Sequence, residues 1–178
     1  SSGGEWNLKA SNRWNSGESD FFAWGDSVIF DDSGASTAVT LSGDLRPAQV
    51  QVQSNTNDYT LTGAIGGSGS LLKSGTSTLT LDGNNTFSGG TIISQGSIVI
   101  TGNNNGLGTG QVVLGDENTG TEDAALLITG GRTLPNSIRV SSDVGGDAII
   151  GFSGSTGPYT VFSGPIELEK NLTIRSGS

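Results

Sequence analysis

Short alternations of apolar and polar residues recur along this chain, and each ends in a glycine. The pattern apolar, any residue, apolar, polar, Gly occurs at Val39-Thr40-Leu41-Ser42-Gly43, Tyr59-Thr60-Leu61-Thr62-Gly63, Leu79-Thr80-Leu81-Asp82-Gly83, Ile98-Val99-Ile100-Thr101-Gly102 and Leu126-Leu127-Ile128-Thr129-Gly130. Apolar residues two positions apart lie on the same face of a β-strand, and the glycine permits a tight turn after it. The pattern therefore predicts many short strands, each with one apolar face.

The spacing of these units predicts a repeat architecture. The glycines at 43, 63, 83 and 102 are separated by 20, 20 and 19 residues, and the spacing then loosens to 13 and 15 through the shortened unit Val112-Val113-Leu114-Gly115. A unit of about 20 residues cannot bury its apolar face alone, whereas stacked copies bury a continuous core. We therefore expect an all-β fold, a right-handed parallel β-helix. A β-sandwich would fit the number of strands but explains the regular glycine spacing less well.

Helix is not expected, because no apolar spacing of three and four residues is sustained over ten positions. The 30 glycines also disfavour helix, while the frequent Thr, Val and Ile favour strands. Strands are expected near 27–31, 37–42, 48–53, 58–62, 70–73, 77–82, 90–94, 97–101, 110–114, 124–128, 136–141, 147–152, 158–162 and 166–175.

The first 35 residues differ from the remainder in their aromatic content. They hold Trp6, Trp14, Trp24, Phe21, Phe22 and Phe30, which include all three tryptophans of the chain. An open solenoid end exposes core and unpaired strand edges, so a cap is needed there. We expect residues 1–35 to form an aromatic N-terminal cap and first rung, and residues 36–178 to form one continuous domain of β-helix rungs.

Composition narrows the functions to consider. The net charge is −9 with only 8 Lys and Arg, which disfavours nucleic acid as a partner. No segment approaches the roughly 18 apolar residues of a membrane helix, so we expect no membrane insertion. The chain has no Cys, no His and no Met. The commonest general base and metal ligand are thereby missing, and the lack of Met suggests a piece of a longer protein.

A known repeat family is similar to the middle of the chain. The stretch Gly67-Ser68-Gly69-Ser70-Leu71-Leu72-Lys73-Ser74-Gly75-Thr76-Ser77-Thr78-Leu79-Thr80-Leu81-Asp82-Gly83-Asn84-Asn85-Thr86-Phe87-Ser88-Gly89-Gly90-Thr91 resembles the passenger-associated transport repeat, also called the autotransporter-associated β-strand repeat. Ser77 stands where that pattern has Gly, and Phe87 where it has Tyr. The similarity continues to Gly102 and into residues 106–110. Weaker resemblances involve Trp24 to Phe30 and residues 162–168.

This resemblance implies a right-handed parallel β-helix in an exported passenger or surface protein of a bacterium. Such segments act as stalks, adhesins or platforms, and the resemblance brings no catalytic residue and no cofactor. It places the chain outside the cell or on the cell surface. The expected partners are adjacent repeats of the same chain and extracellular or host glycans or proteins.

Two other functions have candidate residues in the sequence. A carbohydrate-binding module would stack sugars on Trp6, Trp14, Trp24 and Tyr59, although packing in the cap explains these rings equally simply. A polysaccharide-active enzyme would need two carboxylates at one sugar bond. Its candidates are Asp31-Asp32, Asp116-Glu117, Glu122-Asp123, Glu167 with Glu169, and the acid of Asn55-Thr56-Asn57-Asp58.

We expect these acids to be solvated turn residues, because the supporting motifs of β-helix pectinases are missing. The four carboxylates between Asp116 and Asp123 could suit Ca²⁺, but they follow no EF-hand or glycine-rich calcium repeat. We therefore expect no catalytic residue, no metal and no cofactor in this chain.

Overall fold

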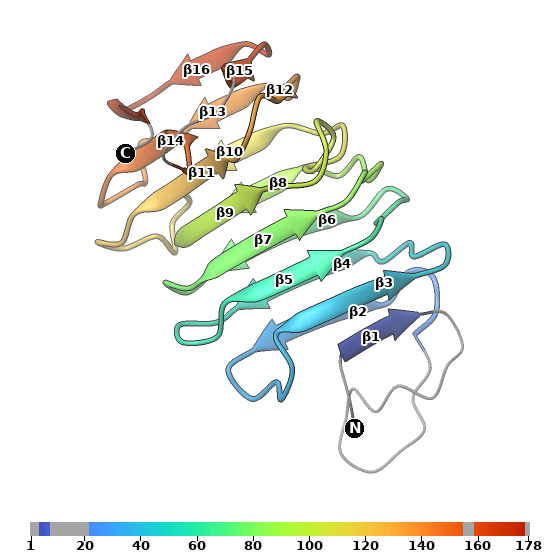
Figure 1. Cartoon of the computed structure of the whole chain (residues 1–178). Coiled ribbons are helices and arrows are strands. Elements are labelled where there is room, and N and C mark those ends of the chain that lie inside the picture. Colours follow the sequence, from blue (N-terminus) through green and yellow to red (C-terminus); the bar gives the residue numbers. More distant parts are fainter. Residues whose placement is uncertain (1–3, 8–21, 155–158, 177–178) are drawn as a thin grey trace.

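The chain forms a right-handed β-solenoid of about seven turns, in which each turn contributes one strand to each of two facing parallel sheets (Figure 1). The structure is a computed structural model that describes residues 4–7, 22–154 and 159–176. Every strand pairing in it is parallel, and no helix occurs among the described residues. The expected all-β parallel β-helix is confirmed.

Two long sheets and one short sheet contain all the named strands. Sheet A consists of β1 (Gly4–Asn7), β3 (Ala38–Ser42), β5 (Tyr59–Thr62), β7 (Thr78–Asp82), β9 (Gly96–Ile100), β11 (Ala124–Ile128), β14 (Ala148–Phe152) and β17 (Leu172–Arg175). Sheet B consists of β2 (Ser27–Asp31), β4 (Gln49–Gln53), β6 (Ser70–Ser74), β8 (Thr91–Ile93), β10 (Val112–Leu114), β13 (Ile138–Val140) and β16 (Ile166–Leu168). The short strands β12 (Thr133–Leu134) and β15 (Val161–Phe162) pair with each other.

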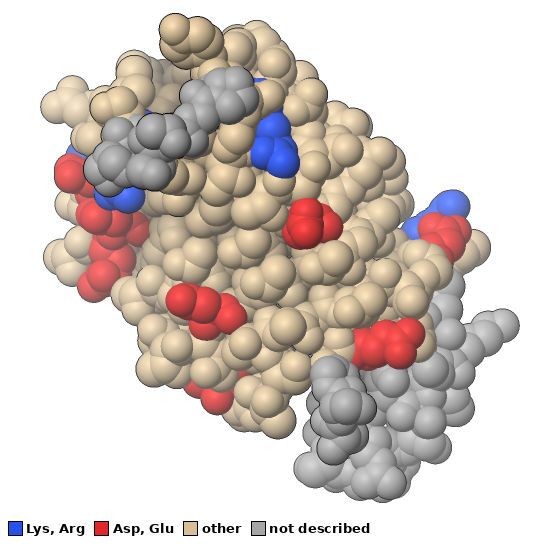
Figure 2. Space-filling view, in the orientation of Figure 1, with Lys and Arg blue, Asp and Glu red and all other residues tan. Residues whose placement is uncertain are grey.

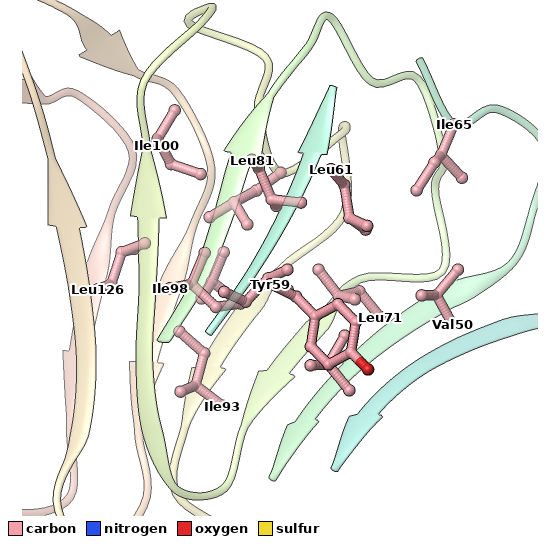
Figure 3. Packing of buried hydrophobic residues seen from close by; sticks show 14 of the residues in the cluster. Val50, Tyr59, Leu61, Ile65, Leu71, Leu81, Ile93, Ile98, Ile100 and Leu126 are labelled. Atoms are coloured by element: carbon pink, nitrogen blue, oxygen red, sulfur yellow. The ribbon is translucent and has the colours of Figure 1, made fainter. Parts of the chain in front are cut away.

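The core consists of columns of aliphatic side chains that run along the solenoid between the two sheets. In sheet A, Leu61 is in register with Leu81, and Leu81 with Ile100. These side chains point toward residues of sheet B such as Leu71 and Ile93 (Figure 3). Each fully buried Leu or Ile contributes about 1.5–3 kcal/mol of hydrophobic stabilisation. The alternation in the sequence therefore produces one continuous core.

The turns lengthen after the third repeat, and this explains the loosened glycine spacing. Leu81 pairs with Ile100, 19 residues later, whereas Ile100 pairs with Ile128, 28 residues later. The shortened unit at Val112 to Leu114 forms β10, which belongs to sheet B rather than sheet A. The sequence spacing thus mixed strands of two different sheets.

The predicted strands match the observed ones with a few exceptions. The strand expected at 166–175 is two strands, β16 in sheet B and β17 in sheet A, because the chain turns between them at residues 169–171. Strands β1 and β12 were not predicted. Both are short, and β12 pairs only with the two-residue strand β15.

Stacked turns approach so closely that some positions accept only glycine. A Cβ added to Gly83 would lie 1.7 Å from the carbonyl oxygen of Gly63 in the turn below. Gly43 has the same place in its repeat but a different reason, because its φ is +86° and no atom lies within 4 Å of an added Cβ. The repeated glycine therefore serves backbone conformation in one turn and close stacking in another.

Aromatic side chains fill the N-terminal end of the core, consistent with an aromatic cap. The Trp6 ring lies 5.0 Å from that of Phe22 and 6.0 Å from that of Phe30, in edge-on contacts. Trp6, Phe22 and Phe30 are all buried. Trp14 and Phe21, which were also expected in the cap, lie outside the described residues.

Candidate functional site

Two of the four candidate sugar-stacking residues lie inside the core. Trp6 and Tyr59 are both buried, and Phe30 lies between them, 5.4 Å from the Tyr59 ring. The Tyr59 hydroxyl donates a hydrogen bond of 2.6 Å to the carbonyl oxygen of Asp31. Burial raises the pKa of Tyr59. In this structure both rings serve packing and present no face to solvent.

The third candidate, Trp24, lies on the surface. Its side chain is 57% exposed, and its indole N–H donates a 2.8 Å hydrogen bond to the carbonyl oxygen of Asp44. The Arg46 guanidinium lies 4.7 Å from the centroid of the ring and forms an ion pair of 2.9 Å with the Asp44 carboxylate. The indole is thus held beside a cation and an anion. The fourth candidate, Trp14, lies outside the described residues, so the structure does not gather these rings into one site.

The carboxylate of Asp32 stabilises the turn at residues 54–57 of the next rung. It accepts hydrogen bonds from the backbone N–H groups of Asn55, Thr56 and Asn57 at 3.0–3.1 Å, and from the hydroxyl groups of Ser54 and Thr56. These bonds, led by that from Ser54, hold the pKa of Asp32 well below its usual value. The carboxylate therefore faces backbone rather than a substrate.

The acidic loop between β10 and β11 is organised by its own hydrogen bonds. Asp116 accepts a 2.9 Å bond from the N–H of Asn118 and a 2.8 Å bond from the hydroxyl of Ser94. Asp123 accepts a 2.8 Å bond from the N–H of Asp147 in the following rung. Across residues 4–7, 22–154 and 159–176, no three acidic side chains come together as a metal site.

The acid pair Glu167 and Glu169 is separated in function by an ion pair. Glu169 accepts a 2.7 Å bond from the Arg139 guanidinium and a 3.2 Å bond from the N–H of Ser142. These contacts, with the Arg139 hydrogen bond the largest, lower the pKa of Glu169. Glu167 lies outward on β16, where it is in register with Arg139.

A buried lysine, which the sequence analysis did not single out, lies among the aliphatic columns of sheet B. Lys73 takes an inner position on β6, in register with Val52 below and Ile93 above, and its side chain has no exposed area. Burial lowers its pKa to about 8, and the carboxylates of Asp58 and Asp32 partly oppose this shift. The signal in the sequence is its spacing, because Lys73 lies two residues after the inward Leu71.

The ammonium of Lys73 is held by backbone carbonyl oxygens. It donates to the carbonyl oxygens of Ser74 at 2.9 Å, Gly75 at 2.6 Å and Gln95 at 3.4 Å. Three donors thus match three acceptors at the inner corner of the turn. Because Gln95 belongs to the next rung, the lysine ties two successive turns together.

The side chain of Gln95 extends this connection to a third turn. Its carbonyl oxygen accepts a 3.1 Å bond from the N–H of Gly75 below. Its amide nitrogen donates to the carbonyl oxygens of Asn118 at 3.2 Å and Thr119 at 3.1 Å above. We call this series of bonds between turns the polar ladder, and it comprises Asp32, Asn55, Lys73, Gln95 and Asp116.

Buried asparagines perform the corresponding task at the opposite turns. The Asn85 amide accepts a 2.8 Å bond from the N–H of Ile65 in the turn below and donates a 2.6 Å bond to the carbonyl oxygen of Gly106 above. Asn136 donates to the carbonyl oxygens of Gly108 and Gly110 at 3.2 and 2.8 Å. Both edges of the solenoid therefore carry side chains that join successive turns.

Charged groups are scattered on the face of sheet A and lie among uncharged surface (Figure 2). The described part of the chain contains no helix long and apolar enough to cross a membrane.

A comparison with protein families identifies the central rungs. Residues 71–100 match the passenger-associated-transport-repeat family. The chain contains a passenger-associated-transport repeat. This repeat spans β6 to β9 and includes Lys73, Asn85 and Gln95, so the matched segment supplies bonds on both edges of the solenoid. No curated protein and no solved structure gave a significant match.

The repeat and the solenoid together fit an autotransporter passenger segment. The repeat family implies a secreted or surface-exposed protein and suggests a structural role for this segment.

Proposed function

We propose that this chain is a non-catalytic stalk segment of an exported bacterial passenger, located outside the cell or on its surface. The observation that carries this proposal is the polar ladder. Its most distinctive polar groups, the Asp32 carboxylate and the Lys73 ammonium, are bound to backbone groups of their own and neighbouring turns. Their hydrogen-bonding capacity supports the stacking of rungs and leaves little for a substrate.

The continuous core supports the same role. Apolar columns and backbone pairing run from β1 to β17, so each turn is stabilised by the turns on either side. Such a rod can hold other parts of a longer protein, and adjacent repeats of the same chain are its first partners. An adhesive role would place those partners among extracellular or host glycans and proteins.

Surface display tests the stalk proposal. The chain is placed between an outer-membrane anchor and a terminal epitope, and antibody binding to intact cells is measured. The wild type and the variants Glu117→Gln and Glu122→Gln are expected to display the epitope equally. The core variant Leu81→Asp is expected to lose the display and become protease-sensitive. Equal display by Leu81→Asp, or loss of display in either surface variant, would contradict the proposal.

A polysaccharide assay tests the non-catalytic part. The folded chain is incubated with a panel of bacterial and plant polysaccharides, and newly formed reducing ends are measured. None is expected. Release that disappears in Asp116→Asn or Glu167→Gln would identify an enzyme instead.

A second candidate function, glycan contact, is supported only by Trp24. An exposed indole beside the Arg46 guanidinium and the Asp44 carboxylate combines a ring for stacking with donors and acceptors for sugar hydroxyls. A glycan array with the wild type and Trp24→Ala tests it, with Ile92→Ala as a control at another exposed apolar side chain. Binding that is lost only in Trp24→Ala would support this function, and no binding by the wild type would exclude it from the panel tested.

A further inference from the structure

The two ends of the solenoid differ in how their apolar side chains are covered. At the N-terminal end, Trp6 and Phe30 are buried. At the C-terminal end, Leu168 of β16 is 56% exposed and Ile174 of β17 is 76% exposed. Both occupy inward positions, because Leu168 is in register with the core residue Val140 and Ile174 with Ile150. The last turn therefore presents core positions to solvent.

The same end also has two free strand edges among the described strands. Strand β17 is the last strand of sheet A, and β16 is the last strand of sheet B. An unpaired edge with exposed apolar side chains is a template for another strand. We propose that this face binds a second copy of the chain, end to end through the C-terminal turns, as a dimer with twofold symmetry.

Charge selects one arrangement of this dimer. The outward side chains at the two edges have opposite charge, Glu167 on β16 and Arg175 on β17. If the twofold axis runs parallel to the strands, β16 of each copy pairs antiparallel with β17 of the other. In one register, Glu167 then lies opposite Arg175 of the second copy, and Leu168 opposite its Ile174. Opposite charges at facing positions stabilise a strand pair.

The alternative twofold axis, perpendicular to the sheets, is disfavoured. It would pair β16 with β16 of the second copy and place Glu167 opposite the Glu167 or Glu169 of that copy. Like charges at facing positions destabilise a strand pair. A closed dimer of the first kind contains the β16–β17 contact twice, as twofold symmetry requires, and leaves the two buried N-terminal caps at its outer ends.

Charge-reversal variants test both the dimer and its register. The mass of the full chain is measured by light scattering during size exclusion over a range of concentrations, and its dissociation constant by analytical ultracentrifugation. The wild type is expected to form a species of twice 18.0 kDa. Glu167→Arg and Arg175→Glu are each expected to weaken the dimer about tenfold or more, because each change acts at both edges. The double variant is expected to recover the wild-type affinity.

Glu5→Arg is the matched control, because it makes the same charge change on β1, the edge strand at the opposite end of sheet A. It is expected to leave the dimer unchanged. Thermal denaturation of every variant shows whether the chain remains folded, which is expected because these side chains point outward. A monomer at all concentrations, or an open series of larger species, would overturn the proposal. Failure of the double variant to recover the affinity would overturn the β16–β17 register.

Discussion

Lys73 and Gln95 join two successive turns of the solenoid from inside and outside the same corner. The Lys73 ammonium donates to the backbone carbonyl oxygen of Gln95 at 3.4 Å, while the Gln95 side chain accepts from the N–H of Gly75, which also receives the lysine on its carbonyl oxygen. A charged residue in an apolar column is therefore part of how the rungs are held in register.

Replacement of Lys73 by Met is expected to destabilise the fold by about 1–3 kcal/mol. The change preserves length and apolar packing but leaves the carbonyl oxygens of Ser74 and Gly75 without their donor. Urea denaturation followed by circular dichroism measures the effect. Lys170→Met is the control, because that half-buried lysine bonds to carbonyl oxygens in the last turns of the chain, and a smaller loss is expected there. A Lys73→Met variant as stable as the wild type would show that these bonds contribute nothing net.

The pKa of Lys73 predicts an unusual pH dependence. Burial lowers the pKa of this residue from 10.5 to about 8, so between these pH values the unfolded chain binds more protons than the folded one. The free energy of unfolding should therefore rise with pH, by about 1–2 kcal/mol from pH 8 to pH 10 relative to Lys73→Met. The cost of burying the charge is present in full below pH 8. Chemical denaturation of both proteins at each pH gives the difference, and a flat or falling difference would contradict the assignment.

Glycine substitutions are expected to separate two kinds of turn. Gly83→Ala should cost several kcal/mol, because the new Cβ would overlap the carbonyl oxygen of Gly63 and push two rungs apart. Gly43→Ala should cost only about 1 kcal/mol, because it meets no atom and suffers only from a positive φ. Thermal melting of the two variants compares them. Equal losses would show that close stacking at Gly83 is not what requires glycine.

Much of the fold can be predicted from the sequence because strand alternation is a local signal. The apolar positions Leu79 and Leu81 alternate with Thr78 and Thr80, and this period fixes which face is buried. The similarity to a repeat family then supplies the stacking of the strands. The assignment of units to sheets A and B could not be obtained in this way, because Val112 to Leu114 resembles the sheet A signature while lying in sheet B.

The environments of individual polar and aromatic residues could not be predicted. Trp6 and Trp24 occur in the same aromatic-rich segment, but one ring is covered by residues distant in sequence and the other is exposed. Lys73 follows the apolar period, yet a lysine is ordinarily exposed. Only the convergence of three carbonyl oxygens from two turns makes its burial possible, and that convergence is a property of the assembled solenoid.

The central claim, a solenoid whose role depends on its stacked core, is tested most directly by a pair of neighbouring substitutions on β7. Leu81→Asp places an unpaired charge at a buried position, and Thr80→Asp places the same charge on the outer face of the same strand. Thermal melting monitored by circular dichroism is expected to show a cooperative transition for Thr80→Asp close to that of the wild type. Leu81→Asp is expected to be unfolded at room temperature. Wild-type melting of Leu81→Asp, or unfolding caused by Thr80→Asp instead, would contradict the account.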